Sequence, residues 1–152
     1  MRLKSSVLFV KDIQRSKDFY INILKQKLVS DFNVNVVFEG GLALWQLQKE
    51  HLLQPYIGFP EKSKVEIYFE ENELEQLFDA LKNEKVEFIH PIHTEEWGQR
   101  TLRFLDPDNH IIEVGESMEY VVGNMYRKGK SVLEIEQITG LPMEFIQKHL
   151  EQ

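Results

Sequence analysis

The sequence predicts an α+β fold in which two βαβββ modules form a barrel-like open sheet, followed by a C-terminal helical tail. Three observations support this prediction. The pattern of one strand, one helix and three strands occurs twice, in residues 1–48 and 64–116. Turn-forming residues separate the strands, and strand patterns end after residue 116. We therefore expect one domain over residues 1–116 and a tail that resembles a helix-turn-helix over residues 117–152.

The first module opens with a short apolar run, which predicts a strand over residues 3–11 that is buried on both faces. The apolar spacing then changes to that of an amphipathic helix over residues 13–26, with Ser16 as a candidate cap. Three strands follow at residues 28–32, 34–39 and 42–48. Gly40 and Gly41 predict a hairpin turn between the last two.

The second module follows a connection over residues 49–64 that shows no sustained period. Alternating apolar residues predict a strand over residues 65–70, and helical spacing predicts a helix over residues 73–82. The remaining strands are expected at residues 86–89, 99–105 and 110–114. The last two are joined by a turn in which Pro107 fixes φ and Asn109 tolerates a left-handed conformation.

The tail shows three short helical patterns. Ser131 followed by Glu134 is the signature of a capping box, and Gly140 predicts the end of that helix. From residue 117 on, four basic and five acidic side chains give a net charge of −1. Glu144 and Glu151 lie on the helix that would read DNA. We therefore do not expect nucleic acid as a partner, and we favour a role in packing or dimerisation.

Composition excludes several classes of function. Eighteen basic against twenty-five acidic residues give a net charge of −7, which disfavours binding to nucleic acid or anionic lipid. The absence of cysteine excludes disulfides, thiolate nucleophiles and zinc or iron sites with thiolate ligands. No apolar stretch near the start has the length of a signal peptide or membrane span, so we expect a soluble, cytoplasmic protein without membrane contact.

Two motifs carry a family resemblance. Val10-Lys11-Asp12 opens the first module, with Phe19-Tyr20 on the helix that follows, and Asp106-Pro107-Asp108-Asn109-His110-Ile111-Ile112-Glu113 closes the second. Together with the two modules, these motifs resemble the vicinal oxygen chelate superfamily, which holds the glyoxalases, bleomycin resistance proteins and extradiol dioxygenases. The stretch from His90-Pro91 through Trp97-Gly98-Gln99-Arg100 and on to Gly115-Glu116 is similar to a bacterial glyoxalase-like subgroup of unsettled activity.

The resemblance implies a site for one divalent metal, bound by four side chains that face inward from the two modules. The positions that match are Glu66 and Glu113 in the second module and Gln46 in the first. The fourth position holds Ser5, whose neutral hydroxyl is a poor ligand. The implied site is therefore degenerate, and the cofactor is a divalent ion (Ni, Mg, Mn, Zn or Fe) or none.

In metal-dependent chemistry of this kind, the ion polarises a substrate carbonyl or enediolate while a carboxylate moves a proton. Glu113 and Glu66 are the catalytic candidates. The alternative is that Arg100 or Arg103 pairs with these two carboxylates for structural reasons, since a buried acid must be paired. The two arginines lie three residues apart in a strand and point to opposite faces, so at most one of them faces a cavity.

The candidate ligand-binding residues are Ser5, His90, Trp97, Arg100 and Arg103. Trp97 precedes Gly98, which frees the backbone to swing the ring over a cavity mouth; burial as an apolar contact is the alternative. His90 and His93 flank Pro91 at an expected strand end and loop. Loop histidines are often exposed to solvent, which is the alternative to ligand contact.

These observations predict a glyoxalase-like protein that binds a small oxygenated molecule in a cavity, as a divalent-metal-dependent lyase or isomerase. A metal-free binding or drug-sequestration protein of the bleomycin-resistance type is the alternative. A regulator that senses a ligand through the tail is a third candidate. Eight strands enclose enough volume for one small ligand, and the resemblance implies modules that combine within or between chains, so a homodimer is favoured.

Overall fold

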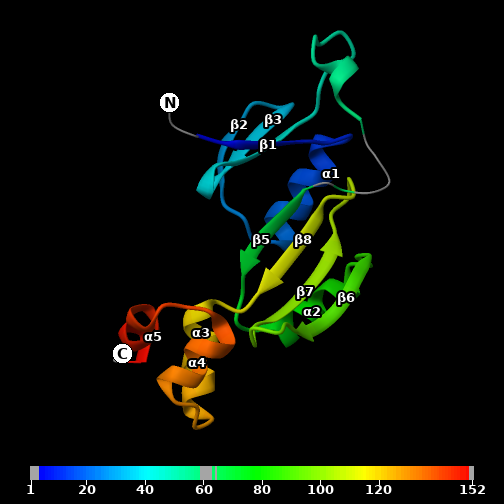
Figure 1. Ribbon diagram of the computed structural model, residues 1–152. Helices are drawn as coiled ribbons and strands as arrows, with labels where there is room; N and C mark the ends of the chain where they lie inside the picture. The colour runs from blue at the N-terminus through cyan, green and yellow to red at the C-terminus, as the bar shows by residue number, and fades with distance from the viewer. Residues whose placement is uncertain (1–3, 59–62, 64, 151–152) are drawn as a thin grey trace. The chain divides into compact units, whose positions relative to one another are not determined.

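The computed structural model describes residues 4–58, 63 and 65–150. The chain forms two compact units, of which the first comprises Met1–Val65 and Leu105–His110 and the second comprises Glu66–Phe104 and Ile111–Gln152. Each unit contains an open four-stranded sheet, and helices end the chain (Figure 1). The predicted α+β fold of two βαβββ modules and a helical tail is therefore confirmed.

The first sheet has the strand order β1-β4-β3-β2. Its strands are β1 (Ser6–Phe9), β2 (Leu28–Asp31), β3 (Asn35–Phe38) and β4 (Leu42–Trp45). β1 runs parallel to β4, and the other pairs are antiparallel. Gly41 lies at the start of β4 with φ +87°, and a Cβ there would be 2.9 Å from the carbonyl oxygen of Lys4. Glycine is therefore required where β1 and β4 approach each other.

Helix α1 (Ile13–Asp18) begins one residue after Asp12, whose carboxylate accepts a hydrogen bond from the Arg15 N–H at 3.0 Å. The prediction that Ser16 caps this helix was wrong, because Ser16 is buried and donates to Asp108. The helix continues as a π-helical turn over Phe19–Ile23 and ends there, before residue 26. Lys25 follows with φ +55°, a conformation that ends a helix.

Two strand predictions for the first module also needed correction. β1 is an edge strand with Leu8 buried and Val7 exposed, so it is buried on one face only. β4 ends at Trp45 rather than at residue 48.

The second sheet has the order β5-β8-β7-β6. Its strands are β5 (Glu66–Glu70), β6 (Phe88–Thr94), β7 (Arg100–Leu105) and β8 (Ile111–Gly115), and α2 (Leu74–Asn83) contacts β6. β6 extends to Thr94, so the prediction that His90 and His93 lie at a strand end and in a loop was wrong. Register shifts on both sides of His90 let this edge strand continue through Pro91.

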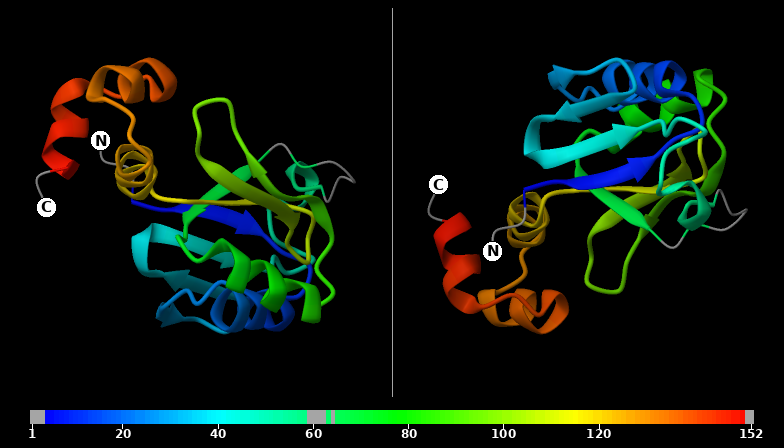
Figure 2. Two further views of the ribbon diagram at one scale, coloured as in Figure 1. Left: turned by 90° about the horizontal axis from the view of Figure 1, so that it is seen from below. Right: turned by 90° about the horizontal axis from the view of Figure 1, so that it is seen from above.

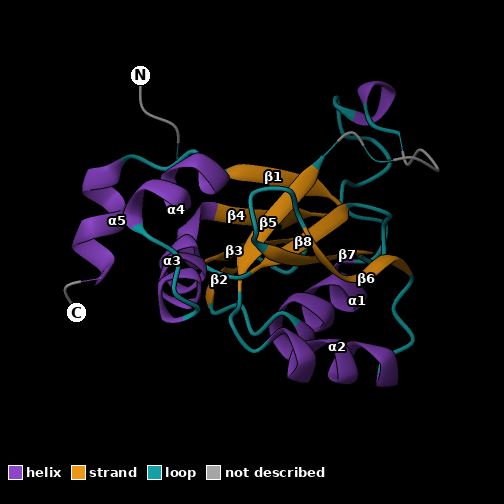
Figure 3. Cartoon of the chain, turned by 60° about the horizontal axis from the view of Figure 1, so that its bottom comes forward, coloured by secondary structure: helices purple, strands orange, loops and turns teal. Residues whose placement is uncertain are grey.

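The tail consists of α3 (Met118–Arg127), α4 (Val132–Thr139) and α5 (Met143–Leu150), which gather at the C-terminal end of the chain (Figures 2 and 3). They pack around Val122, Ile135 and Ile146, which are fully buried. The capping box of Ser131 and Glu134 is confirmed, and α4 ends at Gly140 in the left-handed conformation. In the described part of the chain, no helix is long and apolar enough to cross a membrane.

Candidate functional site

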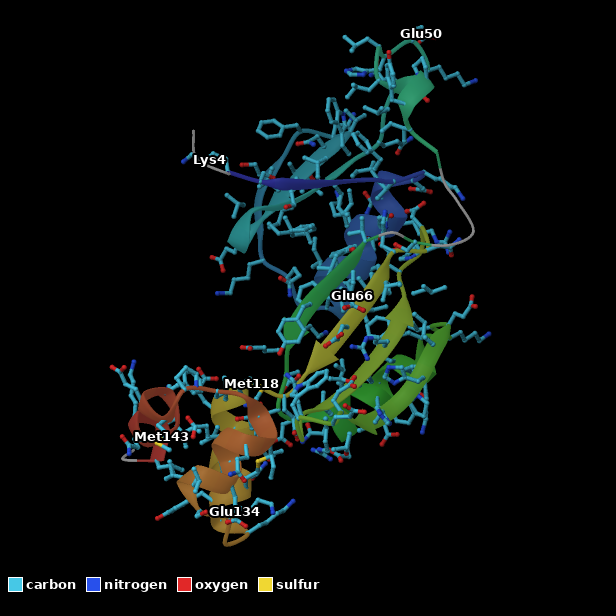
Figure 4. The ribbon with its side chains drawn as sticks, viewed as in Figure 1. Lys4, Glu50, Glu66, Met118, Glu134 and Met143 are labelled. Atoms are coloured by element: carbon cyan, nitrogen blue, oxygen red, sulfur yellow. The ribbon has the colours of Figure 1, made fainter. Side chains whose placement is uncertain are left out.

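One face of the second sheet carries a polar row that crosses all four strands. Tyr68 on β5 is the register partner of Glu113 on β8, and His90 on β6 is the register partner of Arg103 on β7. An ion pair between Arg103 and Glu113 joins the two halves of the row. Glu66 lies two residues before Tyr68 on the same face of β5, where it is labelled in Figure 4.

Arg103 is the centre of this face. Its Nε donates to Glu66 at 3.1 Å, and its Nη2 pairs with Glu113. Its Nη1 donates to Glu95 at 2.8 Å and to His90 Nε2 at 3.1 Å. We call these five residues the Arg103 cluster. A guanidinium carries five N–H groups, and the four contacts named here account for four of them.

Glu113 is the acid of the cluster whose pKa is raised. It is 6% exposed. Burial raises the pKa of its carboxyl, the positive charge of Arg103 lowers it, and the hydrogen bond and charge of Glu66 raise it again, so that the net pKa lies above the ordinary value. Three carboxylates share one guanidinium here, which leaves an excess of negative charge. A carboxyl group with a raised pKa in this setting is suited to accept and return a proton.

Glu95 has the opposite character. Arg103 and the Thr101 hydroxyl both donate to it and hold its pKa below the ordinary value, although burial opposes them. It reaches Arg103 from the β6–β7 turn, which is closed by a hydrogen bond from the Gly98 N–H to the Glu95 carbonyl at 2.8 Å. Glu95 therefore stays ionised and anchors the guanidinium.

Arg100 lies away from this cluster. Its Nε donates to Glu116 at 2.7 Å, and its Nη1 pairs with Glu75 on α2. Only Arg103 of the two arginines therefore contacts Glu66 and Glu113, as the strand alternation predicted. The alternative interpretation, a pairing of these two glutamates with an arginine, is confirmed for Arg103.

The predicted metal ligands are divided between the two units. In the first unit, the Ser5 hydroxyl donates to the Gly41 carbonyl at 2.7 Å. The Gln46 side-chain oxygen accepts from the Ile13 N–H at 2.8 Å and so fixes the start of α1. Glu66 and Glu113 belong to the second unit. The four-residue metal site therefore stays a prediction.

The second unit by itself does not fit a divalent metal. Glu66 and Glu113 have suitable oxygen donors, but Arg103 pairs with both carboxylates and supplies the positive charge that a metal ion would bring. Within residues 4–58, 63 and 65–150, no three Asp, Glu or His side chains are arranged to hold a metal ion. We therefore derive no chemical step through a metal.

Trp97 is partly exposed, and its Nε1 donates to Gln99 at 2.9 Å. That Gly98 lets this ring swing stays a prediction. Gly98 has φ +83° in the closed turn, and a Cβ there would clash with the terminal methyl of Met125 on α3. The glycine admits a close contact with the tail. The position of Trp97 at a cavity mouth stays a prediction.

A second polar cluster, the Asp106 network, lies in the first unit. Asp106 Oδ2 accepts from the Tyr20 hydroxyl at 3.0 Å and faces His110 Nδ1 at 2.9 Å. Asp106 Oδ1 accepts from the backbone N–H groups of Asp108 and His110. Asp108 in turn accepts from the Ser16 hydroxyl at 2.8 Å. The closing motif of the sequence is therefore fixed to the opening helix through buried hydrogen bonds.

A pocket of about 240 Å³ lies beside this network. Its lining includes the apolar side chains of Val7, Phe9 and Ile57 together with His110. Burial lowers the pKa of His110, but the hydrogen bond and charge of Asp106 outweigh burial and raise it. The pocket is suited to enclose an apolar group, but its carboxylate, Asp108, is already engaged by the Lys11 N–H and the Ser16 hydroxyl. The Arg103 cluster is the stronger candidate for chemistry.

Three residues of this face were missed in the sequence. Tyr68 could have been found, because it lies two residues after Glu66 in a strand and shares its face. Glu95 could not, because its reach depends on the register shifts of β6. Gln99 is 5% exposed and makes three hydrogen bonds, none of which has a signature in local sequence.

A sequence profile of the glyoxalase-like domain matches residues 3–119 of the chain. No curated protein matches the chain in sequence.

Solved structures of similar fold were found as well. A protein of unknown function from Agrobacterium tumefaciens str. C58 is 38% identical, with a TM-score of 0.65, over 77% of this chain and 94% of that one. A glyoxalase/bleomycin resistance protein/dioxygenase from Nocardioides is 25% identical, with a TM-score of 0.60, over 76% and 83% of the two chains. A lactoylglutathione lyase from Agrobacterium tumefaciens is 18% identical, with a TM-score of 0.58, over 76% and 93%, and shares the fold.

Proposed function

The chain belongs to the glyoxalase-like domain family, and on that premise we propose that it binds a small oxygenated molecule on the face of the Arg103 cluster. Glu113 transfers a proton there, as in a lyase or isomerase of the glyoxalase type. The observation that carries the proposal is the buried Glu113 carboxyl with its raised pKa, held beside Glu66 by one guanidinium.

The proposed step is proton transfer next to a carbonyl group. The Glu113 carboxylate accepts a proton from the carbon beside the carbonyl, so that a C–H bond breaks and an O–H bond forms. The electron pair moves to the carbonyl oxygen. The fifth N–H of Arg103 donates to that oxygen and stabilises its negative charge. When the neighbouring carbon bears a hydroxyl, transfer of the hydroxyl proton to the enolate oxygen and return of the first proton to the former carbonyl carbon complete an isomerisation. When the carbon next to the deprotonated one bears a leaving group, the enolate electrons reform the carbonyl, a C=C bond forms and the leaving group departs with its bonding pair, which completes a lyase reaction.

Glu66 has a supporting role in this step. Its carboxylate lies beside Glu113 and favours the protonated form of that group after transfer. Arg103 pairs with both carboxylates and keeps them on one face. Glu95 remains ionised and fixes the guanidinium from the opposite edge.

The second candidate is metal-free binding without turnover. The pairing of Arg103 with both carboxylates favours it, since a guanidinium already satisfies the two groups. The Nocardioides relative is named a glyoxalase/bleomycin resistance protein/dioxygenase. In this role, the same face would hold a small molecule by hydrogen bonds alone.

Deuterium exchange separates the two candidates. Hydroxyacetone, a small carbonyl compound with a neighbouring hydroxyl, is incubated with the protein in D₂O, and loss of its C–H signals is followed by proton NMR. We expect exchange above the buffer rate, reduced at least about 100-fold by Glu113→Gln, the usual scale of general-base catalysis. Glu75→Gln, which alters an exposed carboxylate paired with Arg100, is the matched control and retains exchange.

The outcomes are distinct. Saturable binding of hydroxyacetone by calorimetry without exchange favours the sequestration role. Equal exchange in the wild type and in Glu113→Gln contradicts the assignment of Glu113.

The proposal includes a homodimer. The edge strand β2 and the turn after it expose Val29 and Phe32, which are apolar side chains suited to contact with a second copy. Light scattering of the full chain is expected to give the mass of two copies, and a monomer at high concentration contradicts this part.

A further inference from the structure

We propose that Tyr68 is a further ligand-binding residue of this face, whose hydroxyl donates a hydrogen bond to an oxygen of the bound molecule, and that Gln99 fixes the direction of that proton. The identity of the ligand rests on the proposed function. The direction of the hydroxyl proton follows from the contacts of Gln99 alone and is tested separately.

Tyr68 is placed to contact whatever binds beside Glu113. The two residues are register partners on neighbouring strands, so their side chains leave the same face of the sheet next to each other. Tyr68 is 46% exposed, an unusual exposure for a large ring in the middle of a strand. Its ring and hydroxyl are therefore accessible from the face that carries Glu66 and Arg103.

Trp97 determines how the Gln99 side-chain amide is oriented. The indole Nε1 can only donate, and it lies 2.9 Å from Gln99 Oε1. This contact identifies that atom as the amide oxygen. The amide nitrogen therefore faces the other two partners, the Tyr68 hydroxyl oxygen at 2.9 Å and the Glu116 carbonyl oxygen at 2.7 Å.

This orientation fixes the role of the Tyr68 oxygen. The carbonyl oxygen of Glu116 can only accept, so one N–H of Gln99 points to it, and the second N–H points to Tyr68. The Tyr68 oxygen therefore accepts from Gln99, and its own proton points elsewhere. Among the described residues its acceptor is Glu70 at 3.4 Å, a long and exposed contact that a ligand oxygen can replace.

The backbone around Gln99 makes room for this arrangement. A Cβ at Gly115 would lie 2.8 Å from Gln99 Nε2 and 3.2 Å from Tyr68 Cε2. A side chain at this position on β8 would therefore separate the amide from the hydroxyl. At the other end, the turn that carries Trp97 is held against Met125 of α3 through Gly98.

The chemistry of Tyr68 suits a donor rather than a base. Burial raises the pKa of its phenol, the hydrogen bond from Gln99 lowers it, and the neighbouring Glu70 and Glu113 raise it, so that the pKa lies above its ordinary value. The hydroxyl therefore keeps its proton at neutral pH. A protonated hydroxyl can donate to the same developing oxygen charge that Arg103 contacts.

The first experiment uses substitutions that conserve size. Tyr68→Phe removes the hydroxyl. Gln99→Glu places a carboxylate where the amide stood, so the Tyr68 proton turns toward residue 99 and away from the ligand. Each variant is expected to lower the hydroxyacetone exchange rate about tenfold, the scale of one lost hydrogen bond. Because both remove the same donor, the double variant loses no more than either alone.

Tyr126→Phe is the matched control. Tyr126 is a half-exposed tyrosine on α3, and its variant is expected to exchange at the wild-type rate. Unchanged exchange in Tyr68→Phe, while Glu113→Gln loses exchange, contradicts the ligand contact of Tyr68 and leaves the proposed function intact.

A second readout does not depend on any ligand. Tyrosines labelled with ¹³C at Cζ are titrated by NMR, with Tyr68 assigned through the missing signal of Tyr68→Phe. Gln99→Glu is expected to raise the pKa of Tyr68, because an N–H donor is replaced by a negative charge. Trp97→Phe is expected to move it in the same direction by a smaller amount, because the amide loses the partner that orients it.

An unchanged Tyr68 pKa in folded Gln99→Glu overturns the orientation by Gln99. If that variant fails to fold, Trp97→Phe decides the same question. If hydroxyacetone exchange is absent from the wild type, the proposed function fails while this titration still tests the orientation.

Discussion

The Asp106 network and the Arg103 cluster are both built around carboxylates. They differ in whether each carboxylate has enough hydrogen-bond donors. Asp106 has a fully buried side chain, and both of its oxygens have partners in the hydroxyl of Tyr20, the imidazole of His110 and two backbone N–H groups. In the Arg103 cluster, three carboxylates share one guanidinium, and the Glu66 side chain is 44% exposed.

The difference separates a structural carboxylate from a reactive one. A buried acid whose acceptors are all occupied has nothing left to offer a ligand, and its role is to hold the chain together. A group of acids with too few donors keeps a raised pKa at one member and leaves an accessible acceptor at another. The family motif around Asp106 therefore holds the fold together, and we expect the chemistry on the face that the motif reaches only through Glu113.

Replacement of Asp106 should have the largest effect on stability. Asp106→Ala removes one buried partner from Tyr20 and His110 together, and we expect a loss of about 3–5 kcal/mol in the free energy of unfolding, the cost of breaking a buried polar group. Urea denaturation measures it. Asp31→Ala, which breaks a partly exposed pair with Lys17, is the control and costs at most about 1 kcal/mol. A similar loss in both variants contradicts the comparison.

Replacement of Arg103 should cost less stability. Arg103→Met leaves three carboxylates without their shared partner, and we expect a loss of about 1–3 kcal/mol at neutral pH. Lowering the pH should restore part of it, because protonation removes the repulsion among the acids. Chemical denaturation at two pH values measures this. A loss that does not depend on pH indicates that the side chain acts through packing alone.

The same variant should acquire an affinity for divalent cations. Without the guanidinium, Glu66 and Glu113 become a pair of oxygen donors on one face. Titration with Mn²⁺, followed by electron paramagnetic resonance, is expected to show tighter binding by Arg103→Met than by the wild type. Arg100→Met, which removes the guanidinium from Glu75 and Glu116 instead, is the matched variant for comparison. If the wild type binds Mn²⁺ as tightly as Arg103→Met does, then Arg103 does not take the place of a metal ion between the two carboxylates.

The smallest expected effects are those of pH on stability. The Asp106 network and the Arg103 cluster should affect stability in different pH ranges. The raised pKa of His110 stabilises the fold fully below pH 6.5, and this contribution is lost as the pH rises through the folded pKa. The raised pKa of Glu113 acts in the same direction, but its contribution is lost from pH 4.5 upward. His110→Gln should weaken the pH dependence of stability above pH 6.5, and Glu113→Gln should weaken it from pH 4.5 upward. Thermal unfolding measured across this pH range checks both. A weaker pH dependence over the same range in both variants contradicts the assignment.

Periodicity was sufficient for the fold but not for its irregular elements. Alternating and helical spacing located the strands and helices of both modules, because one face of each element is apolar. The π-helical turn at Phe19–Ile23 and the continuation of β6 through Pro91 were missed. Both depend on tertiary contacts, which override local preferences at those positions.

The candidate site was predictable in part. Strand alternation separated Arg100 from Arg103, and it was sufficient to place Tyr68 on the face of Glu66. The pairing of Arg103 with both Glu66 and Glu113 needed the strand order, since β5 is a neighbour of β8 in the sheet but lies far from β7 and β8 along the chain. The amide of Gln99 needed side-chain geometry, because its three partners lie on separate elements.

The titration of Glu113 tests the central claim most directly. The protein is labelled with ¹³C at the glutamate side-chain carboxyls, and the Glu113 signal is assigned through Glu113→Gln and followed by NMR from pH 3 to pH 8. We predict a midpoint above 4.5, the ordinary value, which falls toward that value in Glu66→Gln because the neighbouring charge is removed. A midpoint at or below 4.5 in the wild type would show that Arg103 fully satisfies Glu113, and would contradict its role in proton transfer.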